Sequence, residues 1–513
     1  MTVDPRLDTL EARGLIRLAT IQPELEYLFR HWLVQDAAYN SLLKQERRGL
    51  HRLVGEALEG LYPERRPELS AVLALHFEEA GDEARAIDHL VEAGRYALER
   101  HAITEARGFF DRALALMPAG DEPEYRAKRV EASIGSVKAG WTFNPLEGEL
   151  ATLEAVIPTA EALGDLRLLA EAHVYDAMLR QFGGETHTAS PELRRSLQRI
   201  GEIGRELGDE SIRALPLAIV GTFQIFTGYL REGIAALTEA APVLEARNDS
   251  IGASFARDGL AIGYARLGDF ERAEAAAAQA VELAKDADAI AQLDALIGQA
   301  AVRSAQGRLD EAIPLAQLCI GKAEESGATA CIVVSGFILG DALMRQGLVE
   351  EAKRVLERSG EISLVSGRAF WRPTIEAWLG YAGSLLGEFP ATEQGWDATL
   401  AAAREVGDRF AEAGILWKRG QALAAAAEER DAALADLAAS AALFEEMGAR
   451  PFLARVLRSW GEALRAAGRR DEASDRLRRA LELFEAMGIG GEAEAVRAAL
   501  ANAEGATGVP APS

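Results

Sequence analysis

Apolar residues recur at helical spacing along nearly the whole chain, in stretches long enough for a helix and separated by short polar turns. The segment that starts at Ala261, AIGYARLGDFERAEAAAAQAVELA, contains one amphipathic helix that ends at Gly268 and a second that follows directly. Glycine readily takes the left-handed conformation that closes a helix, and Asp269 can cap the next helix by accepting bonds from its free amides. This pattern predicts an antiparallel helix pair.

The same pattern repeats with a period close to 40 residues. Its turn glycines, which follow one another after 40, 39, 40 and 40 residues, are Gly228, Gly268, Gly307, Gly347 and Gly387. A less regular turn follows around Ala427, and the last turn is at Gly468. Small residues keep a constant offset from these turns, as in the pairs Ala261 and Ala273, Ala300 and Ala312, Gly340 and Ala352, and Gly461 and Ala473. The constant register predicts an array of stacked helical hairpins.

Residues 94–118, GRYALERHAITEARGFFDRALALMP, resemble a tetratricopeptide repeat. The small, small, aromatic, small and proline positions of that motif fall on Gly94, Ala106, Phe110, Ala113 and Pro118. The preceding hairpin fits through Gly81, Ala86, Leu90 and Ala93. The later units exceed the usual period by about six residues and are similar to the longer-helix variety found in large bacterial signalling ATPases. The resemblance implies an all-α fold, a right-handed superhelical solenoid of about ten or eleven tetratricopeptide-like hairpins.

Near the N-terminus, residues 29–43 read FRHWLVQDAAYNSLL and residues 47–51 read RRGLH. An apolar stripe at helical spacing, which predicts a capping helix that leads into the repeats, consists of Leu33, Val34, Ala37, Ala38 and Leu42, continued by Leu50, Leu53, Ala57 and Leu61. The wording of the segment resembles a signature of bacterial STAND-type signalling ATPases, which include adenylate/guanylate cyclase-associated proteins and LuxR-like regulators.

In that family the signature follows an ATPase module and a winged-helix domain and precedes a tetratricopeptide-like array. Residues 7–18, LDTLEARGLIRL, are similar to the last helix and strand of the winged helix. The resemblance extends over about residues 7–120 and implies that the chain corresponds to the C-terminal half of such a protein, without the ATPase module. It also makes His31 a candidate interdomain sensor, with an ordinary interdomain or surface histidine as the alternative.

These patterns divide the chain into six segments: a winged-helix-like remnant (1–30), connecting helices (31–68), two tetratricopeptide-like hairpins (69–118), irregular hairpins (119–210), a regular array (211–504) and a disordered tail (505–513). The irregular part is predicted to contain helices over 146–163, 166–181 and 191–207.

The charge balance argues against a nucleic-acid partner. The chain has 56 lysines and arginines against 80 aspartates and glutamates, a net charge of −24, which would repel a phosphate backbone. The first residues lack the basic and apolar regions of a signal peptide, and the longest apolar run is too short to span a bilayer. Two cysteines in apolar helical runs suit a reducing compartment. We therefore expect a cytoplasmic protein that binds neither nucleic acid nor membrane.

The motifs of catalytic chemistry are missing from the sequence. It has no GxxxxGK[ST] phosphate loop, no HExxH or CxxC spacing for a metal, and no GxSxG elbow. We expect no catalytic residue, no metal and no cofactor, and hence not an enzyme. An enzyme with an unrecognised site remains an alternative.

A surface for partner binding is therefore the main candidate site. In tetratricopeptide arrays the first helix of each hairpin lines the concave face, and projection of that face gives Phe226, Phe255, Asp258, Phe337, Asp341, Arg345, Tyr381 and Trp417. Aromatic residues beside charges suit partner recognition. The alternative is that several of these aromatic residues simply pack between successive hairpins.

The sequence predicts a non-catalytic scaffold or sensor that binds a protein or a small ligand and regulates a signalling ATPase or nucleotidyl cyclase. A free-standing protein–protein interaction adaptor is the alternative, and a fragment of a transcriptional regulator ranks below both. The oligomeric state stays open.

Overall fold

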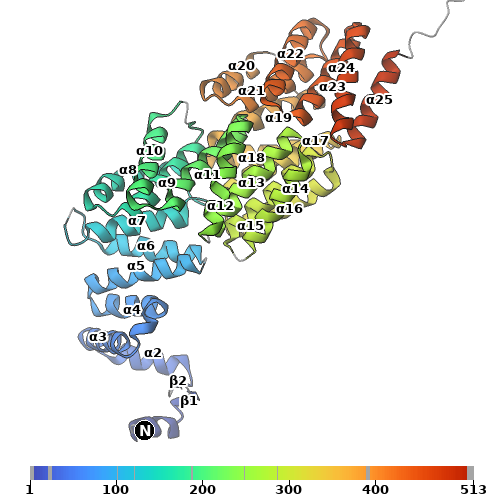
Figure 1. The fold of residues 1–513 in the computed structure, drawn as a ribbon. Helices are drawn as coiled ribbons and strands as arrows, with labels where there is room; N and C mark the ends of the chain where they lie inside the picture. The colour runs from blue at the N-terminus through green and yellow to red at the C-terminus, as the bar shows by residue number, and fades with distance from the viewer. Residues whose placement is uncertain are drawn as a thin grey trace, which may run out of the picture. The chain divides into compact units, whose positions relative to one another are not determined.

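The computed structural model describes residues 5–20, 26–100, 102–120, 122–186, 189–247, 249–285, 287–388 and 393–504. These residues form twenty-five α-helices and one antiparallel sheet of two short strands. They divide into two compact units, unit 1 from Met1 to Ser136 and unit 2 from Val137 to Ser513. The predicted all-α fold is confirmed, because antiparallel helix pairs follow one another as a helical-repeat solenoid (Figure 1).

Unit 1 begins with a helix and a small hairpin, in which Ile16 of β1 faces Phe29 of β2. Its elements are α1 (Pro5–Ala12), β1 (Ile16–Thr20), β2 (Glu26–Phe29), α2 (Trp32–Ser41), α3 (Lys44–Leu61), α4 (Arg66–Ala80), α5 (Glu83–Glu99) and α6 (Ile103–Leu116). The domain boundaries predicted at residues 30, 68, 118 and 210 stay predictions. The predicted disordered tail, 505–513, lies outside the described residues.

The tetratricopeptide-like positions of unit 1 meet as that motif requires. A Cβ atom on Gly94 of α5 would lie 2.6 Å from the ring of Phe110 on α6, closer than any side chain can approach. Phe110, Ala106 and Ala113 are all buried on the same helix. The glycine therefore lets α5 and α6 pack tightly around the phenylalanine ring.

Unit 2 consists of successive helix pairs. Its first helix, α7, begins in unit 1 and ends in unit 2. Its helices are α7 (Arg126–Gly140), α8 (Leu146–Leu163), α9 (Leu166–Phe182), α10 (Pro191–Leu207), α11 (Glu210–Thr227), α12 (Leu230–Ala246), α13 (Ser250–Leu267), α14 (Phe270–Ala284), α15 (Ala289–Ala305), α16 (Leu309–Ser326), α17 (Thr329–Arg345), α18 (Val349–Ser366), α19 (Arg372–Leu386), α20 (Glu393–Glu405), α21 (Arg409–Leu423), α22 (Arg430–Met447), α23 (Arg450–Ala466), α24 (Arg470–Ala486) and α25 (Gly490–Glu504). The three helices predicted between residues 146 and 207 coincide with α8, α9 and α10 to within one residue.

The predicted turns close the hairpins from α11/α12 to α23/α24. Each turn glycine takes the left-handed conformation, with φ of 91° at Gly228 and 74° at Gly268. Asp269 caps α14 by accepting a bond from the amide of Arg272, as its position predicted. The irregular turn holds a short 3₁₀ helix, Ala427–Glu429.

A second series of glycines closes the connections between one hairpin and the next. These residues, all with positive φ and again about 40 residues apart, are Gly327, Gly367, Gly407, Gly448 and Gly488. Both ends of the hairpins therefore carry tight turns in the second half of unit 2, which leaves the loops short enough to pack against other parts of the array.

Candidate functional site

The residues predicted for the concave face all lie on first helices of hairpins in unit 2. Phe226 is on α11, Phe255 and Asp258 on α13, Phe337, Asp341 and Arg345 on α17, Tyr381 on α19 and Trp417 on α21. None of the eight side chains is fully exposed. Asp258 and Trp417 are buried, with 5% of each residue exposed, and the other six are half-buried.

Aromatic rings form a continuous path along these first helices. Phe226 contacts Trp371 with ring centroids 4.8 Å apart, and Phe337 lies between Trp371 and Trp378. Trp378 in turn meets Trp417 edge to face at 6.2 Å. Three of the predicted residues, Phe226, Phe337 and Trp417, are thus joined in one path through Trp371 and Trp378.

A charge cluster lies beside this path and joins distant helices. The Arg455 guanidinium on α23 donates two bonds of 2.8 Å to the carboxylate of Glu492, and Arg345 lies 3.4 Å from the same carboxylate. Asp341 accepts a bond of 2.8 Å from Nε1 of Trp378 and pairs with Arg345 at 3.5 Å. Burial opposes ionisation of Glu492, but the Arg455 and Arg345 cations outweigh it and lower its pKa to about 2.

Lys418 of α21 is a buried cation surrounded by aromatic rings. Its Nζ lies 4.0 Å from the ring centroid of Trp417, 4.7 Å from that of Trp378 and 4.9 Å from that of Tyr381. Ring faces attract cations, which offsets part of the loss of hydration. Burial lowers the pKa of Lys418, Asp341 opposes this effect, and the Arg345 and Arg455 cations add to it, so that the pKa is about 8.

Asp258 lies in the packing between α13 and α15, where its carboxylate touches Gly298. Burial, together with the nearby carboxylate of Asp294, raises the pKa of Asp258 well above its ordinary value. Burial and Asp288 also raise the pKa of Asp294, to about 7. A ligand could not reach Asp258 here, since the side chain is enclosed by the two helices.

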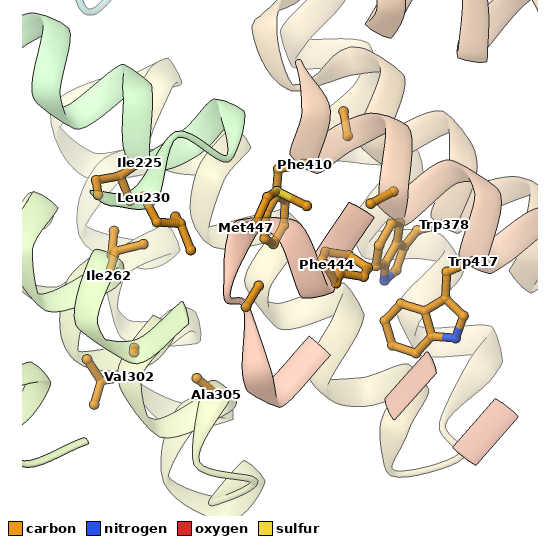
Figure 2. Close-up of a cluster of buried hydrophobic side chains, with 14 of the residues drawn as sticks. Ile225, Leu230, Ile262, Val302, Ala305, Trp378, Phe410, Trp417, Phe444 and Met447 are labelled. Atoms are coloured by element: carbon orange, nitrogen blue, oxygen red, sulfur yellow. The ribbon is translucent and has the colours of Figure 1, made fainter. Parts of the chain in front are cut away.

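Loops from distant repeats meet across unit 2 along a line that we call the seam. On one side are turns inside hairpins, namely 141–144, 184–186, 228, 267–268 and 304–307; on the other are connections between hairpins, with their neighbouring residues, namely 327–329, 367–371, 406–410, 447–455 and 487–492. In Figure 2, Phe410 and Met447 lie between the helices that carry Ile225 and Leu230 and the later helices that carry Phe444 and Trp417. The seam joins residues about 150 to 230 positions apart, so successive turns of the superhelix are stacked on one another.

Arginine side chains make most of the polar contacts at the seam. Nε of Arg450 donates to the carbonyl oxygen of Leu267 at 2.7 Å, and its Nη2 donates to that of Gly268 at 3.2 Å. Arg455 donates to the carbonyl of Ala305 at 2.9 Å, and the fully buried Arg368 donates to that of Trp141. These carbonyls belong to the ends of first helices, where helix dipoles favour a cation.

Trp417 is buried in this structure by neighbouring hairpins. Its ring packs on Lys418 and Trp378, and its Nε1 donates to Ser459 Oγ at 3.0 Å. Space beside the aromatic path is small. A cavity lined by Gln181, Glu185, Thr186, Phe223 and Thr227 measures about 10 Å³, room for about one water molecule. A role of the eight residues in partner binding stays a prediction.

Most of the predicted apolar stripe of α2 and α3 in unit 1 is exposed. Leu33 is 60% exposed, Leu53 63% and Leu61 69%. The helix α3 does pack on α4, where Gly55 lies against the ring of Phe77, but the stripe does not form this contact. His31, the candidate sensor, is exposed just before α2 and makes no capping bond with its side chain.

Several residues of these sites were not predicted. No sequence motif marks Lys418, Arg455 or Glu492. The second series of turn glycines was also missed. A signal existed for the glycines, since their 40-residue period is as regular as that of the first series. In the described part of the chain, three or more histidine, cysteine, aspartate or glutamate side chains nowhere gather as they would around a metal ion. A bilayer could not be crossed by any of the described helices, given their length and polarity.

No family model matches this chain. Over 109 residues it is 33% identical to an uncharacterized protein of Rhizobium meliloti (strain 1021), a match that covers 21% of this chain and 11% of that relative. Among solved structures, a Rap protein complexed with competence and sporulation factor shares 12% identity (TM-score 0.45, 78% of this chain and 98% of that one). The anaphase-promoting-complex hetero-tetramer Cut9–Hcn1 shares 13% (TM-score 0.49, 91% and 89%), and the quorum sensor NprR of B. thuringiensis shares 15% (TM-score 0.41, 66% and 97%).

Proposed function

We propose that the protein is a non-catalytic helical-repeat scaffold that docks onto a signalling module, an ATPase or a nucleotidyl cyclase, through α2 and α3 of unit 1. The exposed apolar stripe on these two helices carries the proposal. Single exposed apolar residues are common, but a row of large ones at helical spacing is typical of an interaction surface.

Charge along the stripe is unevenly distributed. Across α2 and α3, residues 32–61, four basic and four acidic side chains balance. The four basic ones lie close together at the start of α3, and they are Lys44, Arg47, Arg48 and Arg52. A partner with an apolar patch and a carboxylate opposite this basic cluster would match both properties.

His31 lies at the start of this surface, beside Trp32, in the position of a sensor between scaffold and module. In this proposal unit 2 supplies the regulatory input and unit 1 transmits it. The ATPase or cyclase enters the proposal through the resemblance of residues 29–51 to the family signature, so the experiment below tests the identity of the module.

Site-specific cross-linking in the native host tests the proposal. A photo-reactive amino acid replaces Leu53 in one variant and Leu318, an exposed leucine on α16, in a control variant. We expect Leu53, and not Leu318, to cross-link to a protein with a phosphate-loop ATPase or cyclase domain.

Other products at Leu53 would contradict the proposal. Cross-links to a second copy of this chain would make the stripe a self-association surface. Cross-links to proteins without nucleotide-binding domains would favour the free-standing adaptor. ATP turnover by the purified chain, abolished by a single side-chain change, would overturn the non-catalytic assignment.

A further inference from the structure

The seam of unit 2 touches helix ends, not helix faces. Inside a hairpin, α11 and α12 or α13 and α14 pack along their whole length, whereas α11 with α21 and α13 with α23 make only sparse contacts across the seam. On the seam a Cβ atom at Gly307 would lie 3.0 Å from Ile489, and glycines 228 and 268 meet Met447 and Met487. The contacts that hold the turns together are therefore confined to helix ends. They include buried rings, such as Phe223 against Phe370 with centroids 5.2 Å apart and Arg266 over the ring of Phe410 at 3.6 Å.

The polar groups of the seam can all be satisfied by water. Arg450 and Arg455 donate to terminal carbonyls of α13 and α15, and Thr329 donates to the carbonyl of Thr142 with its amide (3.0 Å) and its hydroxyl (2.7 Å). Terminal carbonyls have no partner inside their own helix and are normally hydrated. Parting of the turns would exchange these bonds for bonds to water and break none inside a helix.

The charge cluster beside the aromatic path contains more cations than carboxylates. Arg345, Lys418 and Arg455 are three buried or nearly buried cations, against the two carboxylates of Asp341 and Glu492. A buried excess of like charge is unfavourable, and hydration of these groups would relieve it. The methionines at the seam, Met447 and Met487, are flexible apolar side chains that adapt to changed packing.

We infer that unit 2 has two states, the closed state described above and an open state in which the stacked turns part along the seam while every hairpin stays folded. Opening exposes the aromatic path and the charge cluster, including Lys418. The inference concerns unit 2 alone and does not depend on the docking proposed for unit 1.

The two cysteines of the chain report on opening and on unfolding separately. Cys331 is buried two residues after Thr329, a seam residue, with its thiol 4.0 Å from Oδ1 of Asp294 on α15. Burial raises the pKa of this thiol, and the Arg368 cation of the seam acts in the opposite direction. Cys319 is buried on α16, where its thiol donates to the carbonyl of Leu293 at 3.6 Å. Buried thiols with a raised pKa react slowly, so modification requires exposure.

The experiment measures alkylation of both cysteines by N-ethylmaleimide in increasing, sub-denaturing urea, with each site followed by mass spectrometry. If the turns part, Cys331 reacts at least about tenfold faster than Cys319 and with a weaker dependence on urea, because parting of the seam exposes less surface than global unfolding does. Equal rates with the same steep urea dependence would mean that only global unfolding exposes Cys331, and would overturn the inference.

Two variants make the test specific to the seam. Arg450→Gln removes the bonds to Leu267 and Gly268 and should raise the rate at Cys331 several-fold while the rate at Cys319 and the circular dichroism stay unchanged. Arg458→Gln is the matched control, because Arg458 lies on the same helix and pairs with Glu462 of that helix.

A covalent clamp tests the opposite direction. Thr186 donates its hydroxyl to the carbonyl of Val406 across the seam at 2.6 Å, so Thr186→Cys with Val406→Cys can form a disulfide that holds the turns together. The oxidised clamp should slow alkylation of Cys331 relative to its reduced form. Equal rates in both forms would overturn the inference.

Discussion

At the scale of single residues, buried charges distinguish the packing around the first helices of unit 2 from an ordinary repeat core. Arg455 and Glu492 satisfy one another, and the rings around Lys418 replace part of its hydration. Asp258 has no comparable cation beside it, and a second carboxylate, Asp294, raises its pKa. Its ionised form is thus disfavoured where it lies, which makes Asp258 the residue whose charge should matter most to stability.

Asp258→Asn should stabilise the protein at neutral pH. The pKa of Asp258 is raised in the folded state. The contribution of Asp258 to the stability of the protein is therefore fully present below its ordinary pKa near 4, and it is lost as the pH rises towards the folded pKa. Asparagine is neutral throughout, so we expect the variant to gain about 1–3 kcal/mol at pH 7 and nothing at pH 3.5. Urea unfolding at a series of pH values measures the difference.

Asp475→Asn is the control for that series, because Asp475 is well exposed and pairs only locally with Arg478 among the contacts described. Its effect should be small and nearly independent of pH. A gain at Asp258 that did not change with pH would show that packing, and not charge, was responsible.

At the scale of elements, glycines set how closely paired helices approach. Gly94 gives Phe110 the space that its ring occupies between α5 and α6, whereas Gly108, on α6 itself, has nothing within 4 Å of its Cβ position. The same residue type therefore has opposite effects on stability at these two positions, since in the open position glycine only adds freedom to the unfolded chain.

Gly94→Ala and Gly108→Ala form a matched pair of substitutions. Gly94→Ala places a methyl group against the Phe110 ring and should destabilise unit 1 by about 1–3 kcal/mol, whereas Gly108→Ala should stabilise it by up to about 1 kcal/mol. Equilibrium unfolding gives both values. If Phe110→Leu does not reduce the effect of Gly94→Ala in a double-mutant cycle, the clash with the ring is not its cause.

At the scale of the whole of unit 2, the seam adds long-range coupling to an array that otherwise has contacts only between neighbours. In a simple repeat array, loss of a terminal hairpin affects the hairpin next to it. Here the loop between α24 and α25 and the start of α25 also contact the turns at Gly268 and Gly307. The stability of those early turns should depend on repeats that follow much later in the sequence.

A chain shortened after residue 468, which lacks α24 and α25, tests this coupling. We expect faster amide hydrogen exchange in peptides that contain Gly268 and Gly307, because their partners Met487 and Ile489 are removed. The turn at Gly208, which has nothing within 4 Å of its Cβ position, should keep its exchange rate. Changes confined to α22 and α23 would contradict long-range coupling.

The sequence predicted the hairpins well because the information for them is local. Turn glycines such as Gly228 and caps such as Asp269 act within a few residues, and the helices α8 to α10 followed from apolar spacing alone. The concave-face residues were placed on the correct helices for the same reason. The sequence left open whether these residues face a partner or pack between hairpins, since that depends on how far each hairpin rotates relative to the next.

The exposure of the α2–α3 stripe could not be predicted for a different reason. Apolar spacing shows that Leu50 and Leu53 share a side of the helix, but it does not show what covers that side. The pairing of Arg450 with Leu267 likewise left no mark in the sequence, because a surface arginine and a terminal carbonyl are unremarkable until two turns meet.

The seam has a consequence for how this gene can change over generations. Repeat proteins commonly grow or shrink by duplication and loss of whole units. In this chain the contact between Gly228 and Met447 forms only if a fixed number of hairpins lies between these two residues. Gain or loss of one in that interval would shift every later loop onto the wrong partner, so copy number there should be held constant among descendants while single side chains drift.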